Sequence, residues 1–350
     1  MFEAPVAGVH YPGSLADVRG WFPDDAACLD YLDWLRWREG FVCPGCASVV
    51  AWRLADGRWS CGGCARRVSA TAGTIFHRTR TPLTVWFEAA WLMMTSKNGT
   101  SALNLQRVLG LGSYQTAWAI AHRFRAVMVV PSREKLAGDV EVDETFIGGK
   151  NKPGKRGRGA AGKVMVVGAI ERAPGGRQGF GRARLAVIDN AQAETLRAFV
   201  ADNVAGGSLV ISDALSSYPL ALKGTDCEHD PINVKRSGLK AHELLPGVHL
   251  LFSLTKRWLE GTHQGAAGPQ HLQSYLDEFI FRFNRRTSRR RGLLFLRLLE
   301  RAVETGPITY RQLVAVPAPT KRPITPPGGR SLPRTLAQPR LDRPWRTGGG

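Results

Sequence analysis

Two pairs of closely spaced cysteines constrain the fold of this chain more than any other feature of its sequence. Cys43 and Cys46 form one CxxC pair, and Cys61 and Cys64 form another after residues 47–60. Four thiolates at this spacing suit tetrahedral Zn²⁺, and they leave no position open for water or substrate. Glycines within or beside each pair let the backbone turn its amide groups toward the sulfurs. We therefore predict a zinc ribbon in which these four cysteines bind a structural zinc ion.

The charge balance of the chain indicates a polyanionic partner. Lysine and arginine number 48 against 29 aspartates and glutamates, which gives a formal net charge of +19 over 350 residues. Nucleic acid is the leading candidate, and a solvated basic surface is the alternative. The hydrophobic fraction of 43% is ordinary for a globular protein, and the length allows two or three domains with a core.

The sequence has the pattern of neither a secretory signal nor a membrane span. No basic segment followed by an apolar run opens the chain, and its longest apolar stretch, residues 86–94, is too short to cross a bilayer. We therefore expect a cytoplasmic protein of the bacterial cytosol, associated with the nucleoid and without a membrane partner. Because that compartment is reducing, Cys28 and Cys227 are interpreted as ordinary thiols.

Apolar periodicity and turn residues predict the main elements. A helix is expected over residues 24–39, with Asp24 or Asp25 as its cap. The later helical patterns lie at 193–204, 255–259 and 271–284. Short apolar runs predict strands at 140–147, 164–170, 184–188 and 209–211. The alternation of these strands with a helix indicates a mixed α/β region.

The same patterns divide the chain into five regions. We therefore predict a multidomain protein. Composition marks the last region, which is rich in Pro, Gly and Arg and is expected to be disordered. The predicted regions are an N-terminal helix region at 1–40, the zinc ribbon at 41–80, a helix-turn-helix-like DNA-binding block at 81–135, an α/β domain at 136–305 and a basic tail at 317–350.

Two segments of the N-terminal half are predicted to contact DNA. Arg66 and Arg67 follow the second cysteine pair and suit phosphate contacts, although a solvated basic loop is nearly as good an interpretation. Residues 101–128, with a glycine-containing turn at 110–112, have the dimensions of a helix-turn-helix. Its second helix would present side chains to DNA at its start, and an ordinary helical hairpin is the alternative. These side chains are Ser113, Tyr114 and Gln115.

Further basic residues in the second half of the chain are predicted to bind the DNA backbone. One run, without an acid, follows the strand at 140–147 and would bring DNA toward it. A second cluster lies at 282–291, where an exposed charged helix is the alternative. The predicted contacts are Lys150, Lys152, Lys155 and Arg156 in the first run, Arg257, and Arg285 and Arg286 in the second cluster.

Acidic residues on a predicted strand indicate a metal site. Asp139, Glu141 and Asp143 alternate with valines, so that the acids share one face of the strand. Two explanations are open, an exposed edge strand that carries charge or metal coordination at the centre of a sheet. Asp213 follows the apolar run at 209–211, where open α/β sheets present residues to a crevice.

Asp143 and Asp213, at the ends of neighbouring strands, would bridge two divalent metal ions. One ion lowers the pKa of an attacking water or 3′-hydroxyl, and the other stabilises the leaving oxygen, so that no covalent protein nucleophile is needed. We therefore predict phosphodiester chemistry with two catalytic Mg²⁺ or Mn²⁺ ions as cofactors.

These motifs together resemble those of a zinc-ribbon DDE transposase of the insertion-sequence (IS) family numbered 1595. The resemblance implies an RNase H-like catalytic fold, with Asp143 on the first strand and Asp213 after the fourth. It also implies cleavage and joining of transposon ends, with double-stranded DNA as partner and a homo-oligomeric synaptic complex. It rests on residues 37–46, the second cysteine pair, and residues 96–99, 109–118, 142–149, 212–213, 256–259, 261–265 and 275–286.

The chain departs from the family pattern at the third catalytic position. There the family places Glu or Asn seven residues before a lysine, here Lys256, whereas this sequence has His249. Seven residues is about two helical turns, so both side chains would share a helix face. A neutral imidazole binds divalent ions, but Mg²⁺ prefers oxygen, so Mn²⁺ is expected to serve better. The alternative is that Glu243 or Glu260 completes the site.

The favoured function is therefore a DNA transposase that binds insertion-sequence ends and catalyses two-metal cleavage and strand transfer. The alternative is a non-catalytic zinc-ribbon and helix-turn-helix DNA-binding protein derived from a transposase. A third interpretation is an RNase H-like nuclease or resolvase that cuts DNA without joining it.

Overall fold

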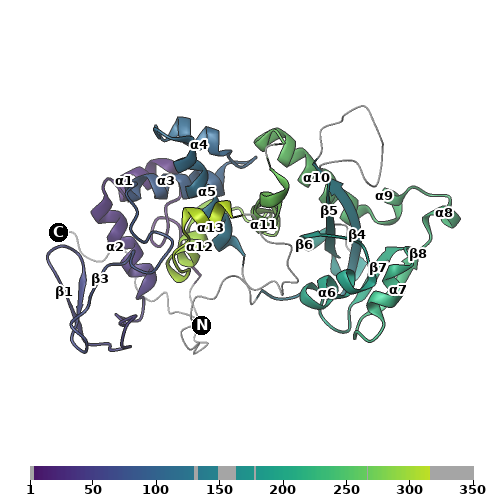
Figure 1. Ribbon diagram of the computed structural model, residues 1–350, viewed down its shortest axis with the longest axis horizontal. Coiled ribbons are helices and arrows are strands. Elements are labelled where there is room, and N and C mark those ends of the chain that lie inside the picture. The colour runs from purple at the N-terminus through teal and green to yellow at the C-terminus, as the bar shows by residue number, and fades with distance from the viewer. Residues whose placement is uncertain (1–3, 130–132, 149–162, 177–178, 266, 316–350) are drawn as a thin grey trace. The chain divides into compact units, whose positions relative to one another are not determined.

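The computed structural model describes residues 4–129, 133–148, 163–176, 179–265 and 267–315 (Figure 1). The chain forms two compact units. One contains the described residues of Met1–Met128 and Ser288–Gly350, and the other contains those of Val129–Thr287. The predicted run Lys150, Lys152, Lys155 and Arg156 and the predicted tail at 317–350 lie outside the described residues. None of the described helices is long and apolar enough to cross a membrane.

The first unit is a helical block with an aromatic core. The rings of Phe22, Tyr31, Phe87 and Phe295 pack edge to face or stacked, with centroids 4.6 to 6.4 Å apart. Phe295 brings in a C-terminal helix, which packs against α2, α3 and α5. The helices are α1 (Leu15–Trp21), α2 (Asp25–Arg36), α3 (Leu83–Thr95), α4 (Ala102–Val108), α5 (Tyr114–Met128), α12 (Arg291–Glu304) and α13 (Tyr310–Val314).

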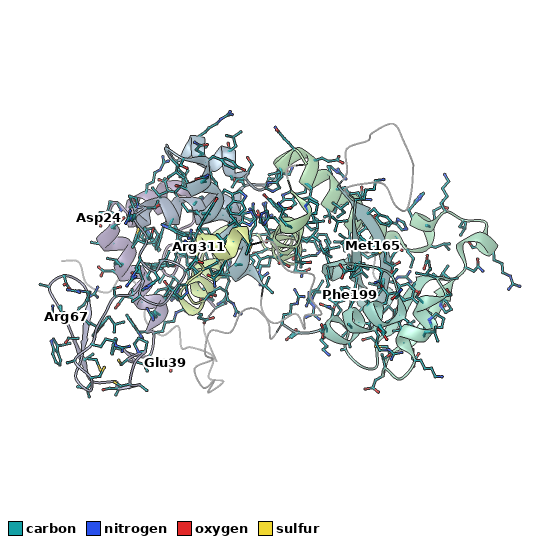
Figure 2. All side chains as sticks on the ribbon, viewed as in Figure 1. Asp24, Glu39, Arg67, Met165, Phe199 and Arg311 are labelled. Carbon is teal, nitrogen blue, oxygen red and sulfur yellow. The ribbon has the colours of Figure 1, made fainter. Side chains whose placement is uncertain are left out.

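Helix α2 and the α4–α5 pair agree with the sequence-based predictions. The side chain of Asp24 accepts a hydrogen bond from Ala27 N at 2.8 Å, so Asp24 is the predicted cap of α2 (Figure 2). Helices α4 and α5 pack on each other and are joined by the glycine-containing turn at 110–112. The predicted helical hairpin is therefore present.

A small antiparallel sheet in the first unit carries the cysteines. Its strands are β1 (Ala51–Arg53), β2 (Trp59–Cys61) and β3 (Arg67–Val68), in the order β1-β2-β3. Phe41 stacks on Trp59 at 5.3 Å, and both pack around the buried Cys43 and Cys61. The ribbon therefore has a small apolar core of its own.

The second unit is built on a five-stranded mixed sheet in the order β6-β5-β4-β7-β8. Strands β4, β5 and β6 are antiparallel neighbours, whereas β7 and β8 run parallel to β4. Along the chain, Asp143 lies on the first strand of this sheet and Asp213 ends the fourth, as the resemblance implies, and the predicted fold class is confirmed. The strands are β4 (Asp139–Ile147), β5 (Val164–Arg172), β6 (Phe180–Ile188), β7 (Leu209–Asp213) and β8 (Glu228–Ile232).

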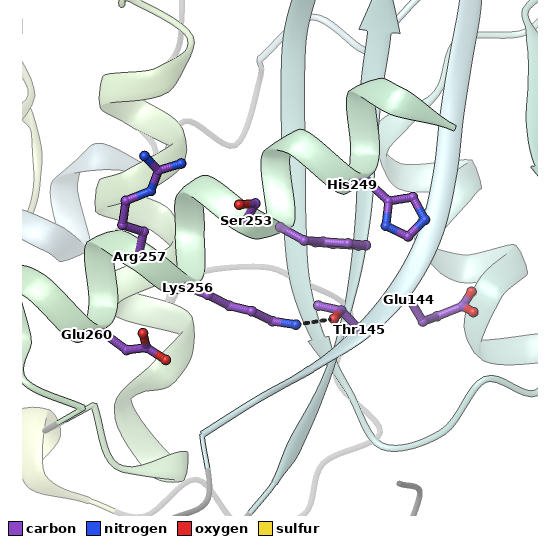
Figure 3. A pocket seen from close by; sticks show the side chains of 8 residues that line it. Glu144, Thr145, His249, Ser253, Lys256, Arg257 and Glu260 are labelled. Carbon is purple, nitrogen blue, oxygen red and sulfur yellow. Dashed lines mark hydrogen bonds between the residues drawn. The ribbon is translucent and has the colours of Figure 1, made fainter. Parts of the chain in front are cut away.

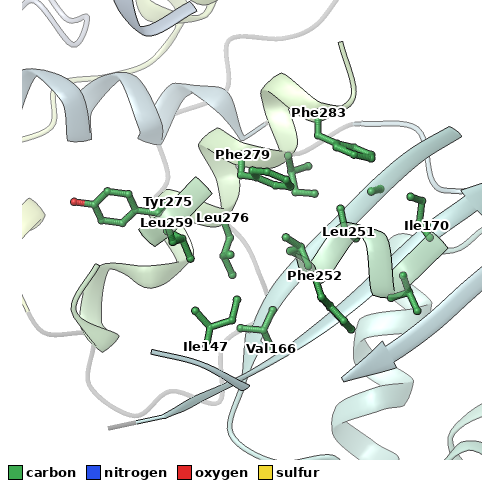
Figure 4. Close-up of a cluster of buried hydrophobic side chains, with 14 of the residues drawn as sticks. Ile147, Val166, Ile170, Leu251, Phe252, Leu259, Tyr275, Leu276, Phe279 and Phe283 are labelled. Carbon is green, nitrogen blue, oxygen red and sulfur yellow. The ribbon is translucent and has the colours of Figure 1, made fainter. Parts of the chain in front are cut away.

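Helices cover both faces of this sheet. On one face α6 (Ala193–Asn203) and α7 (Ser217–Leu222) pack on Val140 and Val142 of β4, and Phe199 of α6 belongs to this core (Figure 2). On the other face α10 (Pro246–His263) and α11 (Leu272–Phe283) form a second core with Ile147 and Val166 (Figure 4). The acidic side of β4 therefore faces α10.

The position of β4 decides between the two explanations of its acids. β4 lies in the centre of the sheet, between β5 and β7, so the exposed edge-strand explanation is wrong. The predicted strand at 184–188 begins earlier, at Phe180, because the antiparallel pairing with β5 extends past its apolar part. Strand β8 was not predicted, since its sequence Glu-His-Asp-Pro-Ile lacks an apolar pattern and the parallel pairing to β7 forms it. The short helices α8 (Val234–Ser237) and α9 (Ala241–Leu244) follow.

Candidate active site and cysteine cluster

The four cysteines converge in the ribbon as their spacing predicted. Their sulfur atoms all lie within 4.8 Å of one another, and no other group of three or more Cys, His, Asp or Glu side chains in the described ranges does so. Gly45 N and Gly63 N point at the sulfurs of Cys43 and Cys61, at 3.4 and 3.3 Å. The amide groups that the glycines were expected to supply are therefore in place, and the cluster suits a structural zinc ion.

Asp143 and Asp213 come together because β4 and β7 are parallel neighbours. Val142 is the register partner of Ser212, so the next residue along each strand is an aspartate. Only 15% of the Asp143 side chain is exposed, and burial together with the charge of Asp213 raises the pKa of Asp143 to about 6. Strands β4 and β7 thus carry two carboxylates near enough for the charge of one to affect the pKa of the other.

Helix α10 brings His249 to the same place. Its Nε2 atom is buried, lies 3.5 Å from Oδ2 of Asp143 and has no hydrogen-bond partner among the described residues. Burial and the neighbouring His242 lower the pKa of His249, so its imidazole is neutral at pH 7. A neutral imidazole with a free buried nitrogen beside a carboxylate has the chemistry of a metal ligand.

A cavity of about 540 Å³ lies beside His249 and is open to the basic side of α10 (Figure 3). Lys256 donates a hydrogen bond from Nζ to Oγ1 of Thr145 at 2.8 Å, and its side chain points toward β4. Burial and the charge of Lys163 lower the pKa of Lys256. The lining side chains are Glu144, Thr145, His249, Phe252, Ser253, Lys256, Arg257 and Glu260.

The two alternative third acids occupy different surroundings. Glu243 is exposed and accepts a hydrogen bond from Lys240 N at 2.7 Å as part of the cap of α9. Glu260 is exposed and lines the cavity three helical turns beyond His249 on α10. His249, by contrast, lies 3.5 Å from Asp143.

Two residues beside the acids were not singled out from the sequence. Glu144 accepts a hydrogen bond from the hydroxyl of Tyr218, which is fully buried in α7. Burial and the charge of Glu144 raise the pKa of Tyr218, so its hydroxyl remains a donor. This bond ties β4 to the helix that follows Asp213. The only signal in the sequence was the position of Glu144 next to Asp143.

Glu141 shares a face of β4 with Asp143, and the sequence pattern predicts no role for it. Its side chain is completely buried, and it forms an ion pair with Arg172 at 2.8 Å. It also accepts a hydrogen bond from Val248 N, at the start of α10, at 3.0 Å. Sequence spacing could not reveal this contact, because the partners lie on β4, β5 and α10.

The predicted DNA contacts lie mostly on the surface of their own units. Arg66 and Arg67 are exposed on the ribbon, as are Ser113, Tyr114 and Gln115 at the start of α5 and Arg257 on α10. In contrast, the Arg286 guanidinium donates to the backbone carbonyls of Phe180 and Gly181, and Arg285 lies 3.9 Å over the ring of Phe281. The last two arginines therefore also hold the end of α11.

Comparisons with known proteins place both regions in transposase families. Residues 135–284 match the ISXO2-like transposase domain, and residues 23–67 match the transposase zinc-ribbon domain. A relative from Halobacterium salinarum, described as an uncharacterized protein in transposable element ISH50, is 29% identical over 141 residues. That match covers 39% of this chain and 45% of the relative, so the chain spans less than half of the relative's length.

One solved structure is also similar, a chain of the simian T-cell lymphotropic virus intasome in complex with PP2A regulatory subunit B56 gamma. It is 13% identical, covers 71% of this chain and 86% of its own, and has a TM-score of 0.25, which is too low to bear on fold or function. The two family matches, by contrast, together span more than half of the chain and contain the cysteine cluster, Asp143 and Asp213. The resemblance seen in the sequence is thereby confirmed, and the chain belongs to the IS1595 family of transposases, with a zinc-ribbon domain ahead of an ISXO2-like DDE transposase domain.

Proposed function

We propose that this chain is an active DNA transposase that cleaves insertion-sequence ends and joins them to target DNA. The observation that carries the proposal is the placement of Asp143 and Asp213 on two neighbouring parallel strands, with His249 of α10 beside Asp143. Each aspartate comes directly after the paired residues Val142 and Ser212, and His249 Nε2 lies 3.5 Å from Asp143. A decayed, purely DNA-binding descendant would have no reason to keep two aspartates on neighbouring strands, where the charge of one raises the pKa of the other.

The donor set suits divalent ions. Two carboxylates supply the hard oxygen ligands that Mg²⁺ and Mn²⁺ prefer, and the neutral imidazole adds a nitrogen that Mn²⁺ accepts more readily than Mg²⁺. Burial and the charge of Asp213 raise the pKa of Asp143, although the Lys256 ammonium acts in the opposite direction. We therefore assign Asp143, Asp213 and His249 as the ligands of two Mg²⁺ or Mn²⁺ ions. When bound, such ions supply Lewis acidity to the attacking and leaving oxygens.

The basic side chains of α10 take the role of holding DNA. Lys256 and Arg257 line the cavity next to His249, and an ammonium or guanidinium there pairs with a backbone phosphate. The hydrogen bond from Lys256 to Thr145 fixes the ammonium before substrate arrives. Lys256 thus orients the phosphate and does not need to accept or give a proton.

The first unit supplies the remaining contacts with double-stranded DNA. A structural zinc ion in the cysteine cluster would hold the ribbon, on which Arg66 and Arg67 are exposed. The start of α5, with Ser113, Tyr114 and Gln115, suits reading of the inverted repeats. Joining of two ends to one target requires a homo-oligomeric synaptic complex, which we include in the proposal.

A strand-transfer assay tests the proposal. The substrate is a labelled duplex made from the sequence that flanks the gene, incubated with the protein, a target plasmid, and Mg²⁺ or Mn²⁺. We expect nicking of the labelled strand and its covalent joining to the plasmid. Asp143→Asn and Asp213→Asn should each abolish both steps while the duplex is still bound. Asp139→Asn, an exposed residue of the same strand, is the matched control and should retain both.

The other outcomes separate the alternatives. Nicking without joining would indicate a nuclease or resolvase, and binding without nicking would indicate a non-catalytic DNA-binding protein. Cleavage by Asp143→Asn or Asp213→Asn at the wild-type rate would refute the assignment of the site.

A further inference from the structure

Glu141 lies beside the candidate metal ligands and is not among the residues that line the cavity. It is completely buried on β4, two residues from Asp143 and on the same face of the strand. One carboxylate oxygen, Oε1, accepts a hydrogen bond from Arg172 Nε at 2.8 Å. The other, Oε2, accepts one from Val248 N at 3.0 Å. Both oxygens of Glu141 thus accept hydrogen bonds from groups of the protein itself.

The contact with Val248 supplies a cap that α10 otherwise lacks. The residue before the helix is Leu245, which has no side-chain hydrogen bond to the first turn. Because the first amide groups of a helix have no partner within it, a carboxylate there satisfies a donor and interacts favourably with the helix dipole. Arg172 also donates a hydrogen bond to the carbonyl of Leu244 at 3.3 Å. The backbone is therefore bonded to the sheet both before α10, at Leu244, and in its first turn, at Val248.

The start of α10 packs tightly against the sheet at Gly247. A Cβ atom at position 247 would lie 2.5 Å from the ring of Phe180 and 3.0 Å from Oε2 of Glu141. Only glycine lets the backbone of α10 approach β4 and β6 this closely. Val248, which receives the cap, is the residue immediately before His249.

We propose that Glu141 is a positioning residue that sets the spacing between His249 and Asp143 by anchoring the start of α10 to β4. The inference rests on the proposed function, in which both side chains bind metal. The two ligands come from different elements, and the Glu141–Val248 bond ties the backbone beside one ligand to the strand that carries the other. A metal ligand supported in this way keeps its geometry when the metal is absent, which increases affinity.

Two double variants separate anchoring from charge. Removing Glu141 alone would leave the Arg172 cation without its ion-pair partner, so Arg172→Met is included in both. In Glu141→Gln/Arg172→Met the amide oxygen still accepts from Val248 N, whereas Glu141→Ala/Arg172→Met has no acceptor. The readouts are hydrogen exchange of the segment 244–250 and Mn²⁺ binding measured by titration calorimetry on zinc-loaded protein, with Asp143→Asn as the reference for loss of the site.

Both pairs lose the bond from Arg172 to the Leu244 carbonyl equally, so the glutamine pair is the reference against which the alanine pair is compared. The alanine pair should exchange faster at 244–250 and bind Mn²⁺ about tenfold or more weakly, the usual range for loss of a residue that supports a metal ligand. Equal exchange and equal affinity in the two pairs, with binding lost in Asp143→Asn, would overturn the positioning role alone. Mn²⁺ binding that Asp143→Asn leaves unchanged would instead overturn the proposed function, and the role of Glu141 with it.

Discussion

The imidazole nitrogen Nε2 of His249 lies 3.5 Å from Oδ2 of Asp143, with the first residue on α10 and the second on the central strand β4. At this position the IS1595 pattern implies an acid or an asparagine. The replacement removes a negative charge from a site that already contains two carboxylates. It also leaves a neutral nitrogen donor, since burial lowers the pKa of His249.

The first prediction concerns metal preference. His249→Ala should reduce strand cleavage more in Mg²⁺ than in Mn²⁺, because Mg²⁺ is more demanding of its ligand number and geometry. His249→Glu, which restores a carboxylate, should shift the ratio of the two rates toward Mg²⁺. Initial rates of nicking in each metal measure this ratio. An equal loss in both metals for His249→Ala would argue against direct ligation by the imidazole.

The second prediction concerns the pH dependence of stability. The pKa of Asp143 is raised to about 6, so folded protein keeps a proton on Asp143 between about pH 4 and pH 6, where the unfolded chain has lost it. Its contribution to stability is therefore most favourable below about pH 4 and is lost as the pH rises through about 6. Asp143→Asn cannot ionise and should be the more stable protein at pH 7, by about 2 to 3 kcal/mol at most.

Urea unfolding of the α/β unit from pH 4 to pH 8 measures this difference. Zinc should be bound in the ribbon, with no free divalent ion present, because a bound cation would stabilise the ionised carboxylate. Asp139→Asn is the control and should show no such trend, since Asp139 is exposed. A stability difference for Asp143→Asn that stays constant across this range would contradict the assigned pKa.

The third prediction concerns the packing of α10 on the sheet. Gly168 of β5 is the register partner of Asp143, and a Cβ atom there would lie 2.5 Å from the ring of Phe252. Gly168→Ala should therefore push α10 away from β4, cost about 1 to 3 kcal/mol and reduce cleavage. Since Phe252 lies one turn beyond His249, the displacement would also move the imidazole.

Gly261→Ala is the matched control for this substitution on α10 itself. A Cβ atom at position 261 has no neighbour within 4 Å, and alanine favours a helix, so stability should rise by about 0.5 to 1 kcal/mol. Thermal unfolding and cleavage rates measured on both variants make the comparison. If the two alanines had the same effect, α10 would not depend on the close approach at Gly168.

The fourth prediction concerns the ribbon. Cys46→Ser should lower the zinc content from about one ion per chain to nearly none, and residues 41–68 should lose their protection from hydrogen exchange. Strands β4 and β7 contain no cysteine and should keep theirs. Cys227→Ser is the control, because Cys227 lies outside the cluster and should leave the zinc content unchanged. Full zinc content in Cys46→Ser would remove that cysteine from the ligand set.

Sequence patterns predicted the local parts of this protein well. The spacing of Cys43 to Cys64 is sufficient for a ribbon, because CxxC pairs form their own turns and the sulfurs need few other residues to converge. The alternation of acids and valines likewise predicted which face of β4 carries Asp143. The resemblance to the family then implied an RNase H-like fold, whereas the order of the strands in the sheet came from the structure.

Only the tertiary structure showed the contacts between elements that are distant in the chain. The centre position of β4, the parallel strand β8 and the capping of α10 by Glu141 depend on pairing and packing across the sheet. No local sequence pattern predicts these contacts, because the residues on each side form their own helix or strand whether or not the contact is made. The sequence by itself thus determined the candidate side chains for the proposed chemistry, and the fold decided which of them lie together. That division follows from the physics, since turns and strand faces are set by neighbouring residues, whereas the distance from His249 to Asp143 is set by the packing of a helix on a sheet.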